Sequence, residues 1–329
     1  MEKVTTQTEL KQVVKTILSQ QTVKNLTFIG CGASMSELYA AYYYGQQNAT
    51  EVGIHLLQAN EFNYAKPAYF GENSVAIVAS LGGTTKESVM AVQKAKQWGA
   101  TVIALTYQED SALTKEADYT LVHKFFESYA AKASKQKVAL GFTVELLYAL
   151  EKTPLYREML AGLEAVDEIA NTAAANTENE ALQFAENYKD VSTIHVLASG
   201  ANYGVAYSTG MFLFMEMQWI NGVVLDSGEF FHGPFELAVK NAPYLLFMSD
   251  GQTRHLDARA LEFLQRFSTK YTVIDAKDYW LDSKIDKQVV DYFDPMVLTA
   301  VMRGFAEKLG ELRKHPLSKR RYMWKLENH

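Results

Sequence analysis

The chain has 329 residues, of which 48% are hydrophobic and 21% are charged, and its formal net charge is -6. Because an acidic surface repels nucleic acids and anionic lipids, this charge argues against a nucleic-acid partner and against a membrane surface. One cysteine, no signal peptide and no bilayer-length apolar run together predict a cytoplasmic protein without an intrachain disulfide. The length predicts two domains.

Short apolar runs alternate with amphipathic segments along the first half of the chain. Strands are expected at 26–31, 54–57, 75–79, 102–106 and 119–122, and helices at 7–21, 35–47 and 86–98. The stretch 134–188 carries helical periodicity with few strand signals. Strands that alternate with helices and end in Gly and Ser turns predict a parallel sheet wrapped by helices.

The same pattern then restarts. Gly200, in a strand-to-turn segment that resembles the one around Gly32, follows it by 168 positions, and Ser249-x-Gly-x-Thr repeats Ser80-x-Gly-x-Thr at an offset of 169. Further strands are expected at 194–198, 223–226, 246–248 and 270–275, with a closing helix at 298–312. Two matches at nearly one offset predict a tandem duplication of a doubly wound, flavodoxin-like α/β unit. We assign 1–165 to the first unit, 166–312 to the second, and 313–329 to a tail that contributes to the active site.

A loop rich in hydroxyl groups and glycine follows the predicted strand 75–79. Free amides at a helix start favour an anion, Ser80, Thr84 and Thr85 add hydroxyl donors, and Gly82 lets a phosphate approach the backbone. Ser34, at an earlier helix start, is a second candidate contact to the same phosphate. The alternative for these residues is ordinary N-capping of helices.

Cofactor and metal motifs are not apparent. The segment 30–35 fails the dinucleotide fingerprint because Met35 stands at the third glycine position, and the Walker pattern is absent. The histidines His55, His123 and His195 lie in or beside predicted strands, without ligand spacing, and are interpreted as structural. The sequence therefore predicts neither a metal nor a cofactor.

The strongest catalytic candidates are an acid and a histidine sixteen positions apart. Glu216 ends an apolar run with helical spacing, which predicts a carboxylate largely removed from water. After a short strand, His232 lies in a turn rich in glycine and aromatic residues. Such a pair can act as general acid and base. The alternative is that His232 is a hydrogen-bonded structural residue.

Three motifs together resemble the sugar isomerase (SIS) domain family in its double-domain form, as in the isomerase half of glucosamine-6-phosphate synthase. They are the segments 31–34, 80–85 and 228–234, and the likeness covers nearly the whole chain. The spacing of Glu216 and His232 is similar to that of the family's proton-transfer glutamate and ring-opening histidine. The ending 315–324 looks most like that of the fructosamine-6-phosphate deglycases.

This resemblance implies a sugar phosphate enzyme. Counted from Pro316, Arg321 stands where the synthase has a lysine that forms an imine, and a guanidinium stays protonated and cannot do so. A deglycase needs no enzyme imine because its substrate already carries nitrogen on C1. The resemblance makes Arg321 and Glu229 candidate substrate contacts. Glu229 and Glu236 would hold His232 or recognise the amine, unless they only stabilise the turn.

The implied reaction is hydrolysis of a 6-phosphorylated fructosamine, such as fructoselysine 6-phosphate, to glucose 6-phosphate and an amine. The family resemblance also implies a homodimer or larger assembly, with the active site at a subunit interface and the histidine donated across it. An aldose-ketose sugar phosphate isomerase and a non-catalytic sugar phosphate sensor remain alternatives.

Overall fold

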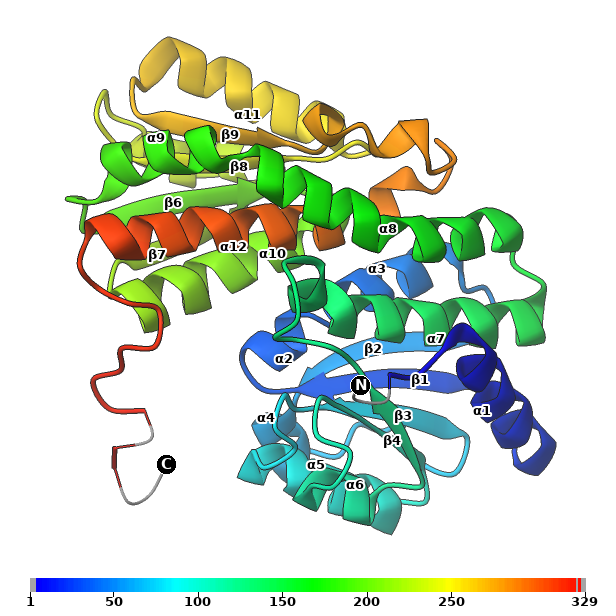
Figure 1. Cartoon of the computed structure of the whole chain (residues 1–329). Helices are drawn as coiled ribbons and strands as arrows, with labels where there is room; N and C mark the ends of the chain where they lie inside the picture. Colours follow the sequence, from blue (N-terminus) through cyan, green and yellow to red (C-terminus); the bar gives the residue numbers. More distant parts are fainter. Residues whose placement is uncertain (1–3, 324, 327–329) are drawn as a thin grey trace.

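The computed structural model describes residues 4–323, 325 and 326, and Figure 1 shows two parallel sheets stacked with helices between and around them. The first sheet has the order β2-β1-β3-β4-β5, and all its strands run parallel. Its strands are β1 (Asn25–Gly30), β2 (Gly53–Gln58), β3 (Ser74–Ala79), β4 (Thr101–Thr106) and β5 (Tyr119–Val122). This order is the flavodoxin-like order, and the five predicted strands are confirmed.

The second sheet repeats the first without its last strand. It has the order β7-β6-β8-β9, formed by β6 (Thr193–Ala198), β7 (Asn221–Asp226), β8 (Tyr244–Met248) and β9 (Tyr271–Asp275). Subtracting strand starts gives 193 − 25 = 168 and 221 − 53 = 168, then 244 − 74 = 170 and 271 − 101 = 170. The near-constant offset confirms the predicted duplication.

The helices form an inner layer shared by both sheets and an outer layer on each. The inner layer holds α1 (Gln7–Gln20), α3 (Tyr39–Asn48), α7 (Ser134–Glu151), α8 (Tyr156–Asn176), α9 (Glu178–Tyr188), α10 (Tyr203–Ser208) and α12 (Asp294–Leu312). The outer helices are α4 (Ala59–Tyr64), α5 (Lys86–Gln97) and α6 (Ala112–Glu116) on the first sheet and α11 (Arg254–Phe267) on the second. Among the described residues, no helix is long and apolar enough to cross a membrane.

Strand β3 shows why the sheet is buried on both faces. Every residue of β3 is buried, with Val75 and Ile77 in the inner core and Ala76 and Val78 in the outer core. A continuous apolar run of this kind is typical of a central parallel strand covered by helices on both sides.

A cluster of tyrosines joins the two units. Tyr39 of α3 lies 5.8 Å from Tyr203 of α10, and Tyr44 lies 5.0 Å from Tyr292, measured between ring centroids. These rings pack across the junction between the two units. Offset and edge-on aromatic pairs of this kind add to the stability of a buried junction.

Three details differ from the sequence-based expectation. The predicted helix 35–47 is interrupted after α2 (Ala33–Ser36), before α3 begins. The outer helices α4 and α11 were not predicted, although α11 has apolar residues at helical spacing. The assigned boundary between residues 165 and 166 falls inside α8, a helix of 21 residues that packs against both α7 and α12, so this boundary stays a prediction.

Candidate active site

Glu216 ends η3 (Thr209–Glu216), a π-helical segment that continues α10. The backbone of Gly210 touches that of Gly222 in β7, and a Cβ added to Gly210 would meet the Val224 side chain at 2.5 Å. Only glycine permits this close approach of helix to strand. The sequence predicted a regular helix here, and the wider π-helical turn is a feature that occurs often at functional sites.

The carboxylate of Glu216 is partly buried and paired with a cation. Its side chain is 21% exposed, and Oε1 lies 2.6 Å from a guanidinium nitrogen of Arg320, whose side chain is 8% exposed. The sequence pointed to Arg321 in this region, but that guanidinium lies over the ring of Trp219 at 4.2 Å. Of the two arginines, Arg320 is the one that contacts the candidate acid.

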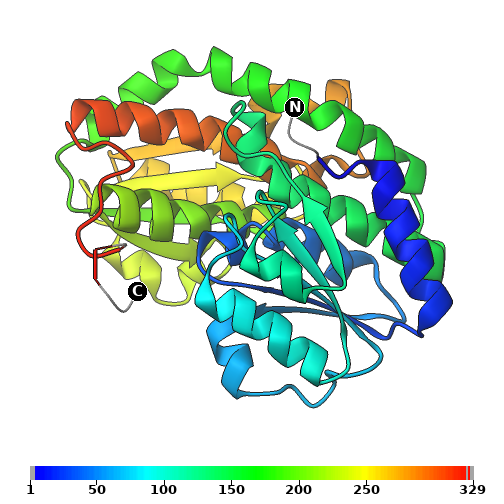
Figure 2. The same cartoon turned by 60° about the horizontal axis from the view of Figure 1, so that its bottom comes forward.

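The polar tail is fixed to the second unit by contacts beside Glu216. The Gln218 amide donates a 2.8 Å hydrogen bond to the carbonyl of His315, and the ring of His315 packs edge-on against Trp219. The red tail and the dark blue helix α1 lie on opposite sides of the molecule in Figures 1 and 2. His315 and Arg320 of the tail therefore lie beside the Glu216 segment. The contribution of the tail to the active site stays a prediction, and residues 324 and 327–329 lie outside the described residues.

The helix that carries Glu216 also covers a turn of the first unit. A Cβ added to Gly32 would lie 3.4 Å from the ring of Phe212, one turn before Glu216. Gly32 itself adopts φ +56°, a left-handed conformation that favours glycine. The structure thus brings the candidate acid of the second unit towards the β1 turn of the first.

The predicted phosphate loop lies beside that turn. β1 pairs with β3 up to Gly30 and Ala79, so the residues that follow leave the sheet side by side at the point where the strand order reverses. The hydroxyls of Ser80 and Thr85 are 3.0 Å apart, and no side chain caps α5. The space over Gly82 is open, with only the Thr84 hydroxyl at 3.7 Å from an added Cβ. Uncapped amides and hydroxyls at a switch point form a suitable anion site.

Ser34 receives a hydrogen bond from a buried lysine that the sequence analysis missed. Nζ of Lys135, in the first turn of α7, donates to Ser34 Oγ at 3.0 Å and forms an ion pair with Glu37. The Lys135 side chain is 3% exposed. Burial and the charge of Lys135 lower the pKa of His123 to about 3, so this imidazole stays neutral near physiological pH.

His232 is exposed and is not brought to Glu216 within one chain. Phe230, just before it, is buried in the outer core of the second sheet, whereas η3 packs on the inner face. No hydrogen bond joins the two candidate catalytic side chains in the described part of the chain. Glu229 and Glu236 are also exposed, and they lie on the same outer segment.

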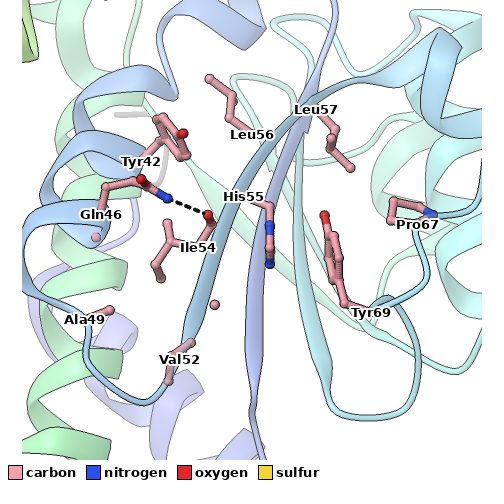
Figure 3. A pocket seen from close by; sticks show the side chains of 12 residues that line it. Tyr42, Gln46, Ala49, Val52, Ile54, His55, Leu56, Leu57, Pro67 and Tyr69 are labelled. Carbon is pink, nitrogen blue, oxygen red and sulfur yellow. Dashed lines mark hydrogen bonds between the residues drawn. The ribbon is translucent and has the colours of Figure 1, made fainter.

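A separate hollow beside the edge strand β2 has a cavity volume of about 570 Å³ (Figure 3). His55 stacks on Tyr69 with ring centroids 3.6 Å apart, and the Gln46 amide donates a 2.9 Å hydrogen bond to the Ile54 carbonyl. The Gln46 amide and the Ile54 carbonyl are therefore bonded to each other. The ring of His55 packs against Tyr69, which fits its interpretation as a structural residue.

The loop after β8, which corresponds to the Ser80 loop after β3, is lined by carboxyl groups. Asp294 is fully buried at the start of α12, and burial raises its pKa well above the usual value. Burial and the nearby charge of Asp250 raise the pKa of Asp291 to about 6. Among the described residues, no group of side chains is arranged to hold a metal ion.

Asp291→Asn is expected to change how stability depends on pH. An acid whose pKa is raised to about 6 on folding, from 3.8, stabilises the folded chain at low pH and loses that contribution as pH rises through 6. The gain in unfolding free energy from the substitution should therefore be larger at pH 8 than at pH 5, by about 1 kcal/mol. Urea unfolding at both pH values measures this difference, and an equal effect at both would contradict it.

Comparison with known proteins identifies the family. Residues 21–147 match the SIS domain model. The chain is 36% identical over 310 residues to fructosamine deglycase FrlB of Bacillus subtilis, covering 94% of each chain. The chain belongs to the SIS-domain sugar phosphate family that contains the fructosamine deglycases.

More distant members agree with this placement. The Escherichia coli fructoselysine 6-phosphate deglycase is 21% identical over 91% of this chain and 85% of its own. The solved structure of a candidate phosphosugar isomerase from Salmonella typhimurium superposes with a TM-score of 0.93 at 31% identity, covering 98% of both chains. This member of the SIS family is therefore a sugar phosphate deglycase or isomerase.

Arg320 and Lys135 were not identified from the sequence as residues of the site. Arg320 belongs to the basic cluster Lys319-Arg320-Arg321, and nothing local shows which member turns inwards. Lys135 is a charged residue at the start of a helix whose next turns are almost wholly buried. A charged residue at the start of such a buried helix is the signal that could have identified it.

Proposed function

We propose that this SIS-family enzyme is a deglycase of 6-phosphorylated fructosamines. The phosphate binds at the loop 80–85 with Ser34, and Glu216 moves the proton. The observation that carries the proposal is the contact of Phe212 with Gly32, because it places the Glu216 helix over the turn beside the phosphate loop.

In the proposed reaction, a single carboxylate transfers a proton from C1 to C2. Glu216 takes a proton from C1 of the open-chain ketoamine, while the C2 oxygen gains a proton, and an enaminol forms. Return of the proton to C2 gives an imine at C1. Water adds to that carbon, the amine leaves, and glucose 6-phosphate remains. Arg320 holds the carboxylate through Oε1, so the acid has a fixed orientation for both transfers.

His232 is proposed to come from a second copy of the chain. It is exposed and lies on the outer segment of the second sheet, while Glu216 lies on the inner side. A two-fold pair could bring the histidine of one copy to the acid of the other, where it would assist opening of the furanose ring. Glu229 would arrive with it and face the substrate amine.

A panel of phosphorylated fructosamines tests the activity directly. We expect release of the free amine and glucose 6-phosphate from 6-phosphorylated compounds and none from the unphosphorylated ones. Fructose 6-phosphate is offered in parallel. Interconversion of fructose 6-phosphate without amine release from any member of the panel would favour an aldose-ketose isomerase and overturn the proposal.

Arg320→Ala is expected to lower kcat by about 10-fold or more with a smaller effect on KM, because the carboxylate of Glu216 loses its orientation. Lys319→Ala is the matched control, since it removes a cation of the same tail that packs on Trp219. Steady-state amine release measures both. Equal losses in the two variants would show that the Glu216 contact has no special role.

A further inference from the structure

The duplication supplies an internal comparison for the phosphate site. The turn glycines Gly32 and Gly200 share φ +56°, and the loops that begin at Ser80 and Ser249 follow equivalent strands. The first α-helix after the last strand of each sheet is α7 in one unit and α12 in the other. The two edges differ in the side chain that the first turn of this helix presents.

In the first unit the charge is positive. Lys135 uses one hydrogen on Ser34 and one on Glu37, and an ammonium group has three. The third hydrogen makes no bond in the described part of the chain. A buried ammonium with a free donor, next to the hydroxyl of Ser34 in the turn beside the anion loop, suits a phosphate oxygen.

In the second unit the first turn of the helix presents a carboxyl group that is already bonded to the loop. Oδ2 of Asp294 accepts 2.8 Å and 3.4 Å hydrogen bonds from the Asp250 amide and the Ser249 hydroxyl. The carboxylate of Asp291 covers Gly251, whereas Gly82 faces open space. The Asp250 amide and the Ser249 hydroxyl therefore already donate hydrogen bonds to a carboxyl group of the protein itself.

We propose that Lys135 is a phosphate-binding residue and that Asp294, its counterpart, occupies the equivalent place in the second unit. Each chain then binds one phosphate ester. The inference rests on the proposed function only for the class of ligand.

The helix that covers each turn supports the same asymmetry. Counting back 168 positions from Glu216 leads to Asn48 at the end of α3, and Tyr43 of α3 lies 3.2 Å from a Cβ added to Gly200. The amide of Asn48 donates to the Tyr292 hydroxyl at 3.0 Å. The second edge thus has neither an open loop like the one at Ser80 nor a carboxylate at the position that corresponds to Glu216.

Titration of the full-length protein with inorganic phosphate tests the inference. We expect one phosphate per wild-type chain, and an affinity at least about 10-fold lower for Lys135→Met. Since that variant leaves the carboxylate of Glu37 unpaired, the double variant Lys135→Met/Glu37→Gln is measured too and should bind equally weakly while remaining folded. Lys137→Met removes an exposed lysine of the same helix and should bind as the wild type does.

Wild-type affinity in the folded double variant, or two phosphates per wild-type chain, would overturn the inference. Amine release is assayed separately with the same preparations. Normal phosphate binding without any amine release would count against the deglycase proposal and leave the role of Lys135 standing.

Discussion

Glu216→Gln is expected to lower amine release by about 10³-fold, because an amide has the shape of the carboxylate but cannot accept and return a proton. The apparent KM should change little, since the phosphate loop and Ser34 are untouched. Initial rates of amine release over a range of substrate concentrations separate the two parameters. A turnover within a few-fold of the wild type would remove Glu216 from the mechanism.

Loss of the ion pair must be separated from loss of the proton carrier in this experiment. The guanidinium of Arg320 is nearly buried and would face a neutral amide in the variant, which costs stability. Thermal unfolding and phosphate titration show whether the variant keeps its fold and its anion site. Glu307→Gln is the matched control, because it breaks an equally short arginine pair, with Arg303, elsewhere in the chain.

His232→Ala is expected to be inactive alone, and so is Glu216→Gln, yet a mixture of the two should regain activity. If each site takes its acid from one chain and its histidine from another, a mixed pair contains one intact site. The isolated mixed pair should therefore show about half of wild-type turnover. Co-expression with two affinity tags, followed by isolation of the doubly tagged species, provides the sample.

The control for this mixture places both substitutions on one chain. Glu216→Gln/His232→Ala paired with Glu216→Gln contains no intact acid and should stay inactive. A mixed pair of the single variants that is verified by its tags and still shows no turnover would contradict the shared site. Activity in His232→Ala alone would instead argue that the histidine is not needed for ring opening.

The sequence predicted the architecture well because the architecture depends on local patterns. Apolar runs mark buried strands such as β3 whatever their partners are, and a repeated offset near 168 reveals a duplication without any knowledge of contacts. The Ser80 loop was also visible, since its hydroxyls and glycines are consecutive.

Contacts between distant segments could not be predicted in this way. Ser34 and Lys135 are 101 positions apart, and Glu216 lies more than a hundred residues from Arg320. The choice of Arg320 over Arg321 depends on how the tail turns after α12. The carboxylates of the second unit were missed for a similar reason, because Asp294 reaches the Ser249 loop from 45 positions away.

The reciprocal covering of the turns bears on how the two halves depend on each other. Phe212 of the second half lies over Gly32 of the first, and Tyr43 of the first half lies over Gly200 of the second. Each of these turns is therefore covered by an aromatic residue of the other half. A separated half would leave its turn uncovered unless it associated with a second half. Because both halves belong to one chain, the two junctions need not carry the same groups, and here the counterpart of Glu216 at an offset of 168 is Asn48.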